Sequence, residues 1–370
     1  MTAHDSRTAL IAGAGIGGLA AGVALGRAGW SVRIHERTTS PRELGFGLLL
    51  APNALSALCE LGVAGAVVNR PVAGSGVEIR RLSGRLIRRF DIPASLPAVV
   101  ALRSELHSAL LAAIGDDALR LGNEVESFTD ETDGVRVRFR DGSTDTARLL
   151  IGADGVSSVI RGQLHPREPP PRPSGFCAVR GVAYGMGRYL GQLTAVGYLD
   201  DGIEAATARA GNDAVYWYLS MLSRDNPSDS RTPAAILTRL MTRFEPSLTA
   251  IVSATKSGDM RFDELFARDP LPWWGRGRVT LLGDAAHPVL PHTGQGGAQA
   301  LEDAVSLGRA LSEDVNVERA LRRYEQSRMR RTRRLIWLGP RIARVTTTRS
   351  VWIQLARSAA IRMVPAWMIK

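Results

Sequence analysis

Cysteine and lysine are both scarce in this chain of 370 residues. The two cysteines, Cys59 and Cys177, are too few for a disulfide framework, and no zinc-finger spacing is present. We therefore expect a cytoplasmic protein without a structural metal. Lysine occurs only at Lys256 and Lys370, so 45 of the 47 basic residues are arginine. This bias is typical of codon composition more than of a recognition surface.

Segments of low complexity are absent as well. Hydrophobic residues make up 45% of the chain and charged residues 22%, which is the ordinary range for a globular protein. At roughly 150 residues per domain, the length predicts about two domains.

The net charge of +11 is concentrated at one end of the chain. Residues 319–370 contain 13 arginines, Lys370 and a single acid, Glu325, so this segment carries +13 and residues 1–318 carry −2. No aromatic stacking platform accompanies the charge. We therefore expect no nucleic-acid partner.

A long apolar run at residues 9–26 would pass for a membrane span by hydropathy alone. However, it contains six glycines and changes midway from a strand-like to a helix-like pattern. We interpret it as a buried strand, a glycine turn and a helix over residues 19–27, followed by a second strand at residues 31–36. This βαβ unit predicts a parallel sheet, and we expect no transmembrane segment.

Other segments indicate antiparallel structure. Residues 74–91 and the mainly strand-like region 176–262 predict antiparallel sheet, whereas residues 103–114 predict a helix and Asp141-Gly142 a hairpin turn. Further helices are expected at 295–312, 316–338 and 350–363, with a break at Gly339-Pro340.

The predicted fold is therefore α/β: a discontinuous Rossmann-like domain with a parallel sheet, interrupted by a smaller antiparallel-sheet domain and followed by a helical tail. We assign residues 1–72, 100–170 and 270–340 to the first domain, residues 73–99 and 171–269 to the second, and residues 341–370 to a C-terminal helical cover. The proline-rich segment 166–173 is expected to be a linker.

The first chemical signal is a glycine motif, G-x-G-x-x-G, with its glycines at 13, 15 and 18. The first glycine permits the turn, the second allows a pyrophosphate to approach the backbone, and the third allows close packing of helix on strand. Glu36 ends the next strand, where its carboxylate can accept hydrogen bonds from a ribose. The motif predicts a dinucleotide site but does not distinguish NAD from FAD.

Two further segments make that distinction. LIGADGVSSVIR at residues 150–161 and VTLLGDAAHPVLPHTGQGGAQALED at residues 279–303 match the paired motifs of single-component FAD-dependent aromatic hydroxylases. The chain closely resembles flavoprotein monooxygenases of the para-hydroxybenzoate hydroxylase type over residues 7–340. It is most similar to the branch that holds urate, salicylate and 3-hydroxybenzoate hydroxylases and zeaxanthin epoxidase. Ala298, where many relatives carry Asn, is consistent with that branch.

The resemblance implies non-covalent FAD and NAD(P)H as a transient co-substrate. By matching motif positions, the residues implied to bind FAD are Gly13, Gly15, Ile16, Gly17, Gly18, Glu36, Arg37, Arg103, Val125, Asp154, Asp284, Pro291, Gly294, Gln295, Gly296 and Gly297. No second dinucleotide motif is present, so FAD should occupy the single site.

The resemblance also implies the activity, in which one oxygen atom from O2 passes through a C4a-hydroperoxyflavin to an electron-rich aromatic or heteroaromatic substrate. No catalytic residue is certain; Tyr216 and Arg180 are the candidates. We expect substrate contacts from Arg180, Tyr216, Tyr218 and Pro291, with Trp217 on the opposite face of its strand and in the core. His292 is interpreted as a surface or packing residue.

Two alternative functions remain open. One is epoxidation or hydroxylation of a lipophilic isoprenoid or polycyclic compound at a membrane, motivated by the arginine-rich tail with Trp337, Trp352 and Trp367. The other is flavin binding without oxygenase turnover. For the tail we favour a cover packed on the FAD domain, with Val351, Trp352, Leu355 and Ala359 buried, over a peripheral membrane contact. The expected partners are a small aromatic molecule and O2, in a monomer or homodimer.

Overall fold

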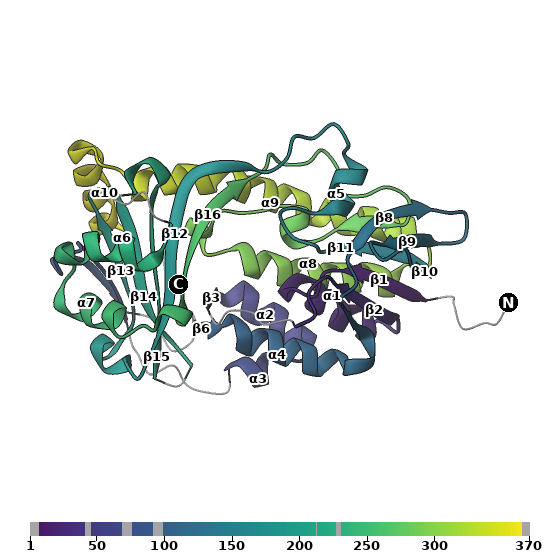
Figure 1. Cartoon of the computed structure of the whole chain (residues 1–370), viewed down its shortest axis with the longest axis horizontal. Coiled ribbons are helices and arrows are strands. Elements are labelled where there is room, and N and C mark those ends of the chain that lie inside the picture. The colour runs from purple at the N-terminus through teal and green to yellow at the C-terminus, as the bar shows by residue number, and fades with distance from the viewer. Residues whose placement is uncertain are drawn as a thin grey trace.

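The computed structural model describes residues 7–40, 46–68, 76–91, 99–211, 213–226 and 231–364. A parallel sheet with its helices and an antiparallel sheet lie end to end along the long axis of the molecule (Figure 1). The expected α/β class with a separate antiparallel sheet is confirmed.

The parallel sheet has the strand order β17-β11-β1-β2-β7. Its strands are β1 (Thr8–Ala12), β2 (Ser31–Glu36), β7 (Leu119–Leu121), β11 (Leu149–Gly152) and β17 (Val279–Leu281). The central strands β1 and β11 are buried throughout, as expected for a parallel sheet covered on both faces. Because distant parts of the chain supply these strands, the domain is discontinuous in sequence.

Helices pack around this sheet. They are α1 (Ile16–Arg27), α2 (Pro52–Leu61), α3 (Ala64–Val68), α4 (Arg103–Ile114), α5 (Val159–Leu164), α8 (Gly296–Glu313) and α9 (Val317–Thr346). Helix α1 lies against α4 and α8. A Cβ added to Gly308 of α8 would lie 2.9 Å from the Cβ of Ala24, so α1 and α8 approach closely because both are small at this point.

A three-stranded antiparallel sheet packs against the parallel sheet. It consists of β8 (Val125–Asp130), β9 (Val135–Phe139) and β10 (Thr144–Ala147). The predicted Asp141-Gly142 turn joins β9 to β10. His35 of β2 and Phe139 of β9 stack with ring centroids 4.4 Å apart.

The large, mainly antiparallel sheet has nine strands, with β16-β12-β15-β14-β13-β4-β5 as its main path, and the pairs β13–β4 and β14–β6 are parallel. Its strands are β3 (Gly47–Leu50), β4 (Gly76–Arg80), β5 (Leu86–Asp91), β6 (Val99–Leu102), β12 (Arg172–Tyr184), β13 (Leu193–Asp200), β14 (Ile203–Ala210), β15 (Ala214–Leu222) and β16 (Met260–Ala267). Strands β3 and β6 lie mostly in ranges that the sequence assigned to the other domain. Helices α6 (Pro233–Leu240) and α7 (Pro246–Ser253) contribute to the core on one face of the sheet.

The linker and the helix break differ from expectation. Strand β12 already begins at Arg172, inside the expected linker, and Pro173 pairs with Phe266 of β16. The predicted break at Gly339-Pro340 is wrong, because α9 continues through Pro340 to Thr346. Gly339 is buried, and a Cβ added to it would lie 3.5 Å from the Cβ of Leu290.

The C-terminal helix α10 (Val351–Met363) also differs from expectation. It packs against β5 of the antiparallel sheet and the end of α9, not on the parallel-sheet domain. The expected burial of its apolar face is wrong: Val351, Trp352 and Leu355 are 64%, 80% and 51% exposed. Ala359 is exposed too, whereas the polar residue Gln354 is buried. Trp367 lies outside the described residues.

Within the described ranges, none of the helices has both the length and the apolar character that crossing a membrane requires. The apolar run at residues 9–26 is divided between β1, the glycine turn and α1.

Candidate cofactor and substrate site

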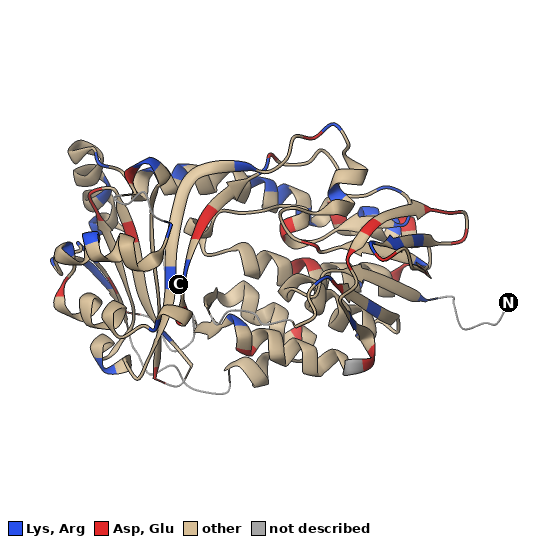
Figure 2. Cartoon of the chain, in the orientation of Figure 1, with Lys and Arg blue, Asp and Glu red and all other residues tan. Residues whose placement is uncertain are grey.

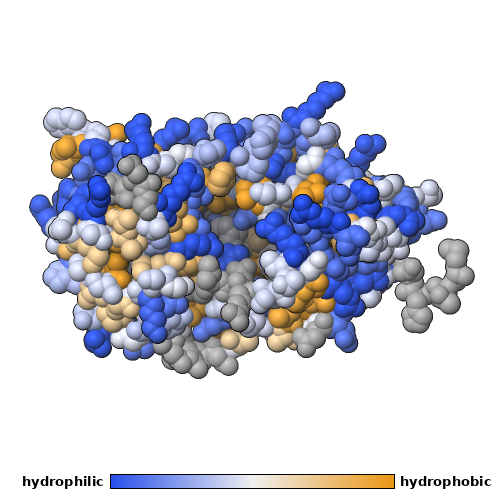
Figure 3. All heavy atoms as spheres, viewed as in Figure 1, coloured by the Kyte–Doolittle hydropathy of each residue, from blue (hydrophilic) through white to orange (hydrophobic). Residues whose placement is uncertain are grey.

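A cavity of about 650 Å³ lies between the two large sheets. The face of the molecule in Figure 3 is hollowed between its two lobes. Among the residues named from the sequence, those lining the cavity are Gly15, Ile16, Gly17, Arg103, Asp284, Pro291, Gly294, Gly296, Gly297, Arg180, Tyr216 and Tyr218. Its described lining does not include Gly13, Gly18, Glu36, Arg37, Val125, Asp154 or Gln295.

The glycines of the turn before α1 differ in their surroundings: some are closely packed, and one faces open space. Gly13 has φ of 103°, and a Cβ on Gly18 would lie 1.9 Å from the Gly13 carbonyl oxygen. A Cβ on Gly17 would lie 2.9 Å from Leu282. In contrast, a Cβ on Gly15 would meet no atom within 4 Å. Gly15 therefore leaves space over the start of the helix, as a bound group would require.

The amino end of α1 is suited to an anion. Gly15 is its N-cap, no side chain caps it, and its first turn contains no acid. The first backbone N–H groups of a helix lack intrahelical partners and carry the positive end of the helix dipole. A pyrophosphate at this position would satisfy them.

Glu36 ties the end of β2 to the glycine turn. Its Oε2 accepts a hydrogen bond from the Ala14 amide at 2.9 Å, and its Oε1 accepts one from the Thr38 amide at 3.0 Å. The Asn123 amide donates to the Glu36 carbonyl oxygen at 2.9 Å, which places the start of β8 at Val125 nearby. Arg37 is exposed next to Glu36.

Asp154 caps the short helix after β11. Its Oδ2 accepts from the Val159 amide at 2.7 Å, while its Oδ1 is buried and has no protein partner. Burial raises the pKa of Asp154, and the hydrogen bonds from Ser158 and nearby amides oppose that shift. The unpartnered oxygen beside the cavity-lining Gly155 is an acceptor that protein groups leave free.

Asp284 lies in a single helical turn, Gly283–Ala285, that follows β17. Its side chain is open to the cavity, yet the surrounding protein raises its pKa, and His287 and Arg103 oppose that rise. Arg103 also lines the cavity, and its amide donates to the Phe46 carbonyl at 2.7 Å. These two residues place opposite charges on the same part of the cavity wall.

A buried charge cluster that the sequence did not reveal fixes the Asp284 loop. Asp303 of α8 accepts from the Gly283 amide at 3.1 Å, from Arg328 Nε at 2.7 Å and from His287. Burial alone would raise the pKa of Asp303, but His287 and Arg328 outweigh it and hold the pKa below its ordinary value. The only signal in the sequence was that His287 and Asp303 lie in the second family motif.

Arg161 supports the same loop from the other side. It is fully buried and donates to the Ala285 and Ala286 carbonyls at 3.1 Å each. Its guanidinium also pairs with Glu168. Arg161 ends the LIGADGVSSVIR motif, but the sequence alone did not indicate that it contacts the Asp284 loop.

The loop before α8 brings backbone to the cavity. Gly294 adopts a left-handed conformation with φ of 63°, and a Cβ on Gly297 would lie 2.6 Å from Leu48. Gln295 Oε1 instead accepts from Asn53 and Gln299, each at 3.2 Å, so its side chain is held within the protein. No side chain caps α8 and its first turn has no acid, so a second helix amino end faces the cavity.

The antiparallel sheet supplies the opposite wall. Tyr216 and Tyr218 of β15 line the cavity, whereas Trp217 is 1% exposed on the other face and donates to Thr255 at 2.9 Å. Arg180 of β12 pairs directly with Tyr218 in register and forms an ion pair with Asp263 at 3.3 Å. Burial raises the pKa values of both tyrosines, so their hydroxyls remain protonated donors at neutral pH.

The sequence did not predict the polar groups that lie next to these tyrosines. The Tyr218 hydroxyl donates to Glu204 at 2.5 Å, and Ser220 lies 3.0 Å from His292 Nε2. His292 also contacts Phe176 edge-on with ring centroids 5.2 Å apart. It lines the cavity and is not a surface residue. Burial lowers the pKa of His292, which keeps it neutral near pH 7.

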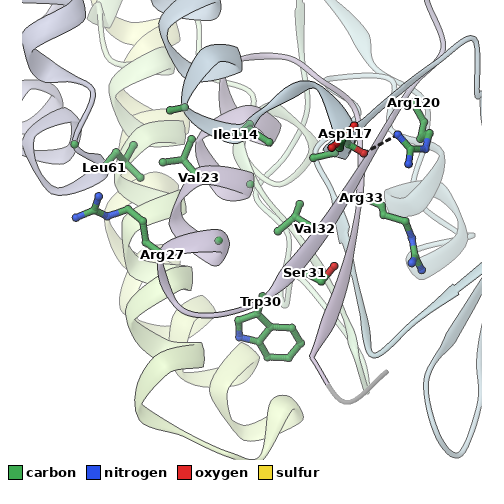
Figure 4. A pocket seen from close by; sticks show the side chains of 15 residues that line it. Val23, Arg27, Trp30, Ser31, Val32, Arg33, Leu61, Ile114, Asp117 and Arg120 are labelled. Atoms are coloured by element: carbon green, nitrogen blue, oxygen red, sulfur yellow. Dashed lines mark hydrogen bonds between the residues drawn. The ribbon is translucent and has the colours of Figure 1, made fainter. Parts of the chain in front are cut away.

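A second hollow lies at the opposite end of α1 (Figure 4). Its lining includes Arg27, Trp30, Arg33 and Arg120, and Arg120 donates to the Asp117 carbonyl at 2.7 Å. This is the carboxyl end of the helix, where the dipole disfavours anions. It shares no lining residue with the cavity between the sheets.

Comparisons with known proteins agree with this geometry. A family model described as "FAD binding domain" matches residues 6–337. The chain is 33% identical over 367 residues to the aurachin C monooxygenase/isomerase of Stigmatella aurantiaca, covering 96% of this chain and 94% of that protein. It is 30% identical over 346 residues to a FAD-dependent urate hydroxylase of Klebsiella pneumoniae, covering 89% and 87%.

Solved structures give the same result. The crystal structure of Klebsiella pneumoniae HpxO complexed with FAD and uric acid superposes with a TM-score of 0.91 at 26% identity. The match covers 98% of this chain and 94% of that one.

Proposed function

This chain belongs to the FAD-binding family of flavin-dependent aromatic hydroxylases, and on that basis we propose that it hydroxylates an electron-rich aromatic or heteroaromatic molecule. In this reaction one atom of O2 enters the substrate and the other leaves as water. NAD(P)H supplies the two electrons that the second atom requires. The chain is thus a monooxygenase that uses FAD, with NAD(P)H and O2 as co-substrates.

The residues of the cavity fit FAD. The open space at Gly15, the two uncapped helix amino ends and the unpartnered oxygen of Asp154 are features that protein groups leave unsatisfied. We propose that Gly15, Ile16 and Gly17 hold the pyrophosphate, Glu36 the adenosine ribose, and Asp284 the ribityl hydroxyls. Pro291, Gly294, Gly296 and Gly297 would support the ring system. When bound, FAD supplies redox chemistry and O2 activation.

The remaining residues assigned to the cofactor either shape the loops around it or lie near its adenosine and diphosphate parts. Gly13 and Gly18 shape the turn, while Gln295 holds the loop through Asn53 and Gln299. Arg103 would place a guanidinium near the diphosphate. Its position on the same part of the cavity wall as Asp284 supports this assignment. Arg37, Val125 and Asp154 would lie near the adenosine and diphosphate parts of the cofactor.

The protein's own part in the reaction is to position the substrate and exclude water. We propose that the protonated hydroxyl of Tyr216 donates a hydrogen bond to a polar atom of the substrate, and that the Tyr218 hydroxyl, which donates to Glu204, accepts one. Arg180 shares the carboxylate of Asp263 with Arg261, whose Nε lies 2.7 Å from the other carboxylate oxygen, so these three side chains together carry one positive charge.

The size of the residues on the sheet wall supports a substrate larger than one ring. Alanines at 178, 195, 206 and 208 line the cavity beside the two tyrosines. These small side chains leave apolar room next to polar groups, which suits a bicyclic ring or an alkyl-substituted one.

A single observation carries this proposal: one continuous cavity joins the glycine turn and Asp284 to the wall of Tyr216 and Tyr218. The test is to reconstitute the protein with FAD and measure NAD(P)H oxidation with a panel of phenols, purines and bicyclic nitrogen heterocycles. We expect a compound that accelerates oxidation and gains an atom from isotopically labelled O2. Stoichiometric FAD without any such acceleration would favour a flavin-binding protein without oxygenase turnover.

A variant tests the substrate wall separately from the cofactor. Ala206→Leu should weaken substrate binding by tenfold or more, because about three added carbon atoms fill the cavity. FAD affinity should not change. Thr238→Leu on the exposed surface of α6 serves as the matched control.

A further inference from the structure

The C-terminal end of the molecule has an apolar surface that faces solvent. It is formed by Val351, Trp352, Ile353, Leu355 and Met363 of α10, together with Trp337, Leu338 and Val345 near the end of α9. Each of these side chains is between 45% and 80% exposed. We call this set the C-terminal patch. A cluster of large exposed apolar residues of this kind is unusual on a protein that is covered only by water.

The orientation of α10 is fixed by hydrogen bonds and is not an accident of loose packing. Arg357 donates to the Val345 and Thr346 carbonyls at 2.9 and 2.7 Å, and Gln354 donates to the Thr348 carbonyl at 3.2 Å. The Val345 and Thr346 carbonyls are at the end of α9 and have no helical donors of their own, whereas Thr348 belongs to the turn that follows. Since the polar face of α10 must turn inward to supply donors, its apolar face turns outward.

Helical spacing places the patch residues on continuous stripes. Trp337, Arg341 and Val345 follow each other at intervals of four and therefore share one face of α9. On α10 the residues at 351, 352, 355, 359 and 363 share the face opposite Gln354 and Arg357. The two helices meet at the Thr347–Ser350 turn, so the stripes lie on neighbouring elements.

Arginines surround this apolar surface. Arg341, Arg344 and Arg362 are exposed, and the guanidinium of Arg341 lies 3.8 Å from the ring centroid of Trp337. Arg349 is exposed as well and pairs with Asp225 at 3.3 Å. No acidic residue occurs in the sequence after Glu325. Figure 2 shows arginines along α9, leading toward this end of the molecule.

We propose that the C-terminal patch binds an anionic lipid surface. Exposed tryptophan and aliphatic side chains on one helix face, bordered by arginines, have the composition of helices that lie in the membrane interface. The arginines would contact phosphate headgroups while the apolar side chains enter the boundary of the acyl chains. This proposal does not depend on the identity of the substrate.

Charge argues against a second copy of this chain as the occupant. A two-fold dimer formed through the patch would place the same arginines opposite one another. Like charges across an interface are unfavourable, and no acid near α10 in the later sequence compensates them. An anionic membrane provides the complementary charge.

The test is co-sedimentation of the FAD-loaded full chain with phosphatidylcholine vesicles, with and without phosphatidylglycerol. We expect binding only to the vesicles that contain phosphatidylglycerol, with blue-shifted tryptophan fluorescence. Binding should decrease sharply as added salt shortens the Debye length from about 10 Å at 0.1 M to about 3 Å at 1 M.

Two sets of variants separate the charge contribution from the apolar one. Replacing Arg341, Arg344 and Arg362 by Gln should weaken binding by about fivefold per arginine, or roughly a hundredfold in total. Replacing Val351, Trp352 and Leu355 by Ser should weaken it by about tenfold or more and reduce the fluorescence shift, since only Trp337 of the two patch tryptophans remains. Thermal unfolding of both variants should match that of the unchanged chain, because these side chains are exposed.

The matched controls replace the same kinds of exposed side chain, arginine and an aliphatic residue, outside the C-terminal patch. Replacing Arg136 and Arg138 of β9 and the following Arg140 by Gln removes three exposed charges at the far end of the molecule, and Val315→Ser removes an apolar side chain that is 87% exposed. Both controls should retain binding within about twofold of the unchanged chain.

Several outcomes would overturn the proposal. One is an absence of binding to phosphatidylglycerol vesicles at low salt, and another is equal loss of binding in the β9 control. A third is a concentration-dependent dimer in analytical ultracentrifugation that the Ser variant dissociates, because this would identify a second copy as the occupant.

Discussion

The two walls of the cavity are built in different ways. On the cofactor side, glycines, helix amino ends and a buried charge cluster present mainly backbone, whereas on the sheet side, alternating side chains of β12, β14 and β15 form the surface. Where the backbone wall is closely packed, as at Gly18 and Gly297, it tolerates no added atoms, while a wall made of side chains can change without altering the fold. This difference explains why relatives named for different substrates share one architecture.

The largest effect is expected where the cofactor wall has no room at all. Gly18→Ala would place a Cβ 1.9 Å from the Gly13 carbonyl oxygen. We expect a loss of about 4 kcal/mol in the free energy of unfolding, measured with urea on FAD-free protein. Gly26→Ala in the same helix is the control, since nothing lies within 4 Å of that position and alanine should add roughly 0.5 to 1 kcal/mol. Similar stability of both variants would contradict the steric explanation.

The next effect concerns the charge cluster behind the cofactor wall. Asp303→Asn removes the fully buried carboxylate that pairs with Arg328 and His287, leaving Glu302 as the remaining carboxylate partner of Arg328, and should cost about 3 kcal/mol of unfolding free energy at pH 7. Asp269→Asn breaks an exposed pair with Arg172, so that control should cost less than about 1 kcal/mol.

The pH dependence of stability sharpens this prediction. The pKa of folded Asp303 is lowered from its ordinary value of 3.8, so its contribution is fully present above that value. The contribution is lost as the pH falls through the folded pKa, because the unfolded chain then binds the proton more readily. The difference between Asp303→Asn and the unchanged chain should therefore shrink in acid. A constant difference would count against the assignment.

Gly15→Ala tests the part of the cofactor wall where the FAD-free protein has room for an added methyl group. Because no atom lies within 4 Å of the added Cβ, the FAD-free protein should keep its stability within about 1 kcal/mol. FAD affinity should fall by tenfold or more, since the methyl group would occupy the space proposed for the pyrophosphate. Fluorescence titration with FAD measures this loss, and unchanged affinity would remove Gly15 from the site.

A smaller effect is expected on the sheet wall. Tyr218→Phe removes the hydroxyl that donates to Glu204 and should reduce stability by about 1 kcal/mol. FAD affinity should remain the same, while the KM for a substrate found in the panel should rise severalfold. Tyr189→Phe, at a ring 38% exposed and distant from the cavity lining, is the control. A loss of FAD affinity in Tyr218→Phe would show that the two walls do not act independently.

The smallest effect is expected outside both walls. Trp352→Ser should change the unfolding free energy by less than about 0.5 kcal/mol, because its side chain is 80% exposed. Thermal unfolding and FAD content provide the measurement. A loss of several kcal/mol would mean that the helix face is covered in solution.

Much of the cofactor wall could be predicted from the sequence because its signals are local. The strand, the glycine turn and α1 follow one another within 20 residues, and the hairpins and the helix at residues 103–114 also follow from local patterns. The charge cluster could not be predicted in this way. It joins Gly283, His287, Asp303 and Arg328 from separate elements, and nothing in the sequence indicates their contact.

The orientation of α10 was predicted wrongly for a related reason. Helical periodicity identifies which residues share a face but not the direction in which that face points. The direction depends on carbonyls at the end of α9, to which Arg357 donates, and on the Thr348 carbonyl in the following turn, to which Gln354 donates. On the sheet wall, strand alternation correctly separates Trp217 from the two tyrosines, but the partners Glu204 and Asp263 come from neighbouring strands.

The continuity of α9 through Pro340 has a mechanical consequence. Gly339 lies close to Leu290 of the cavity lining, since a Cβ added to it would be 3.5 Å from the Leu290 Cβ, and Val345 of the C-terminal patch lies six residues further along the same helix. At 1.5 Å per residue these points are about 9 Å apart along a single rigid rod. A molecule resting on a surface through its patch would therefore hold the reaction chamber at a constant height and tilt above that surface.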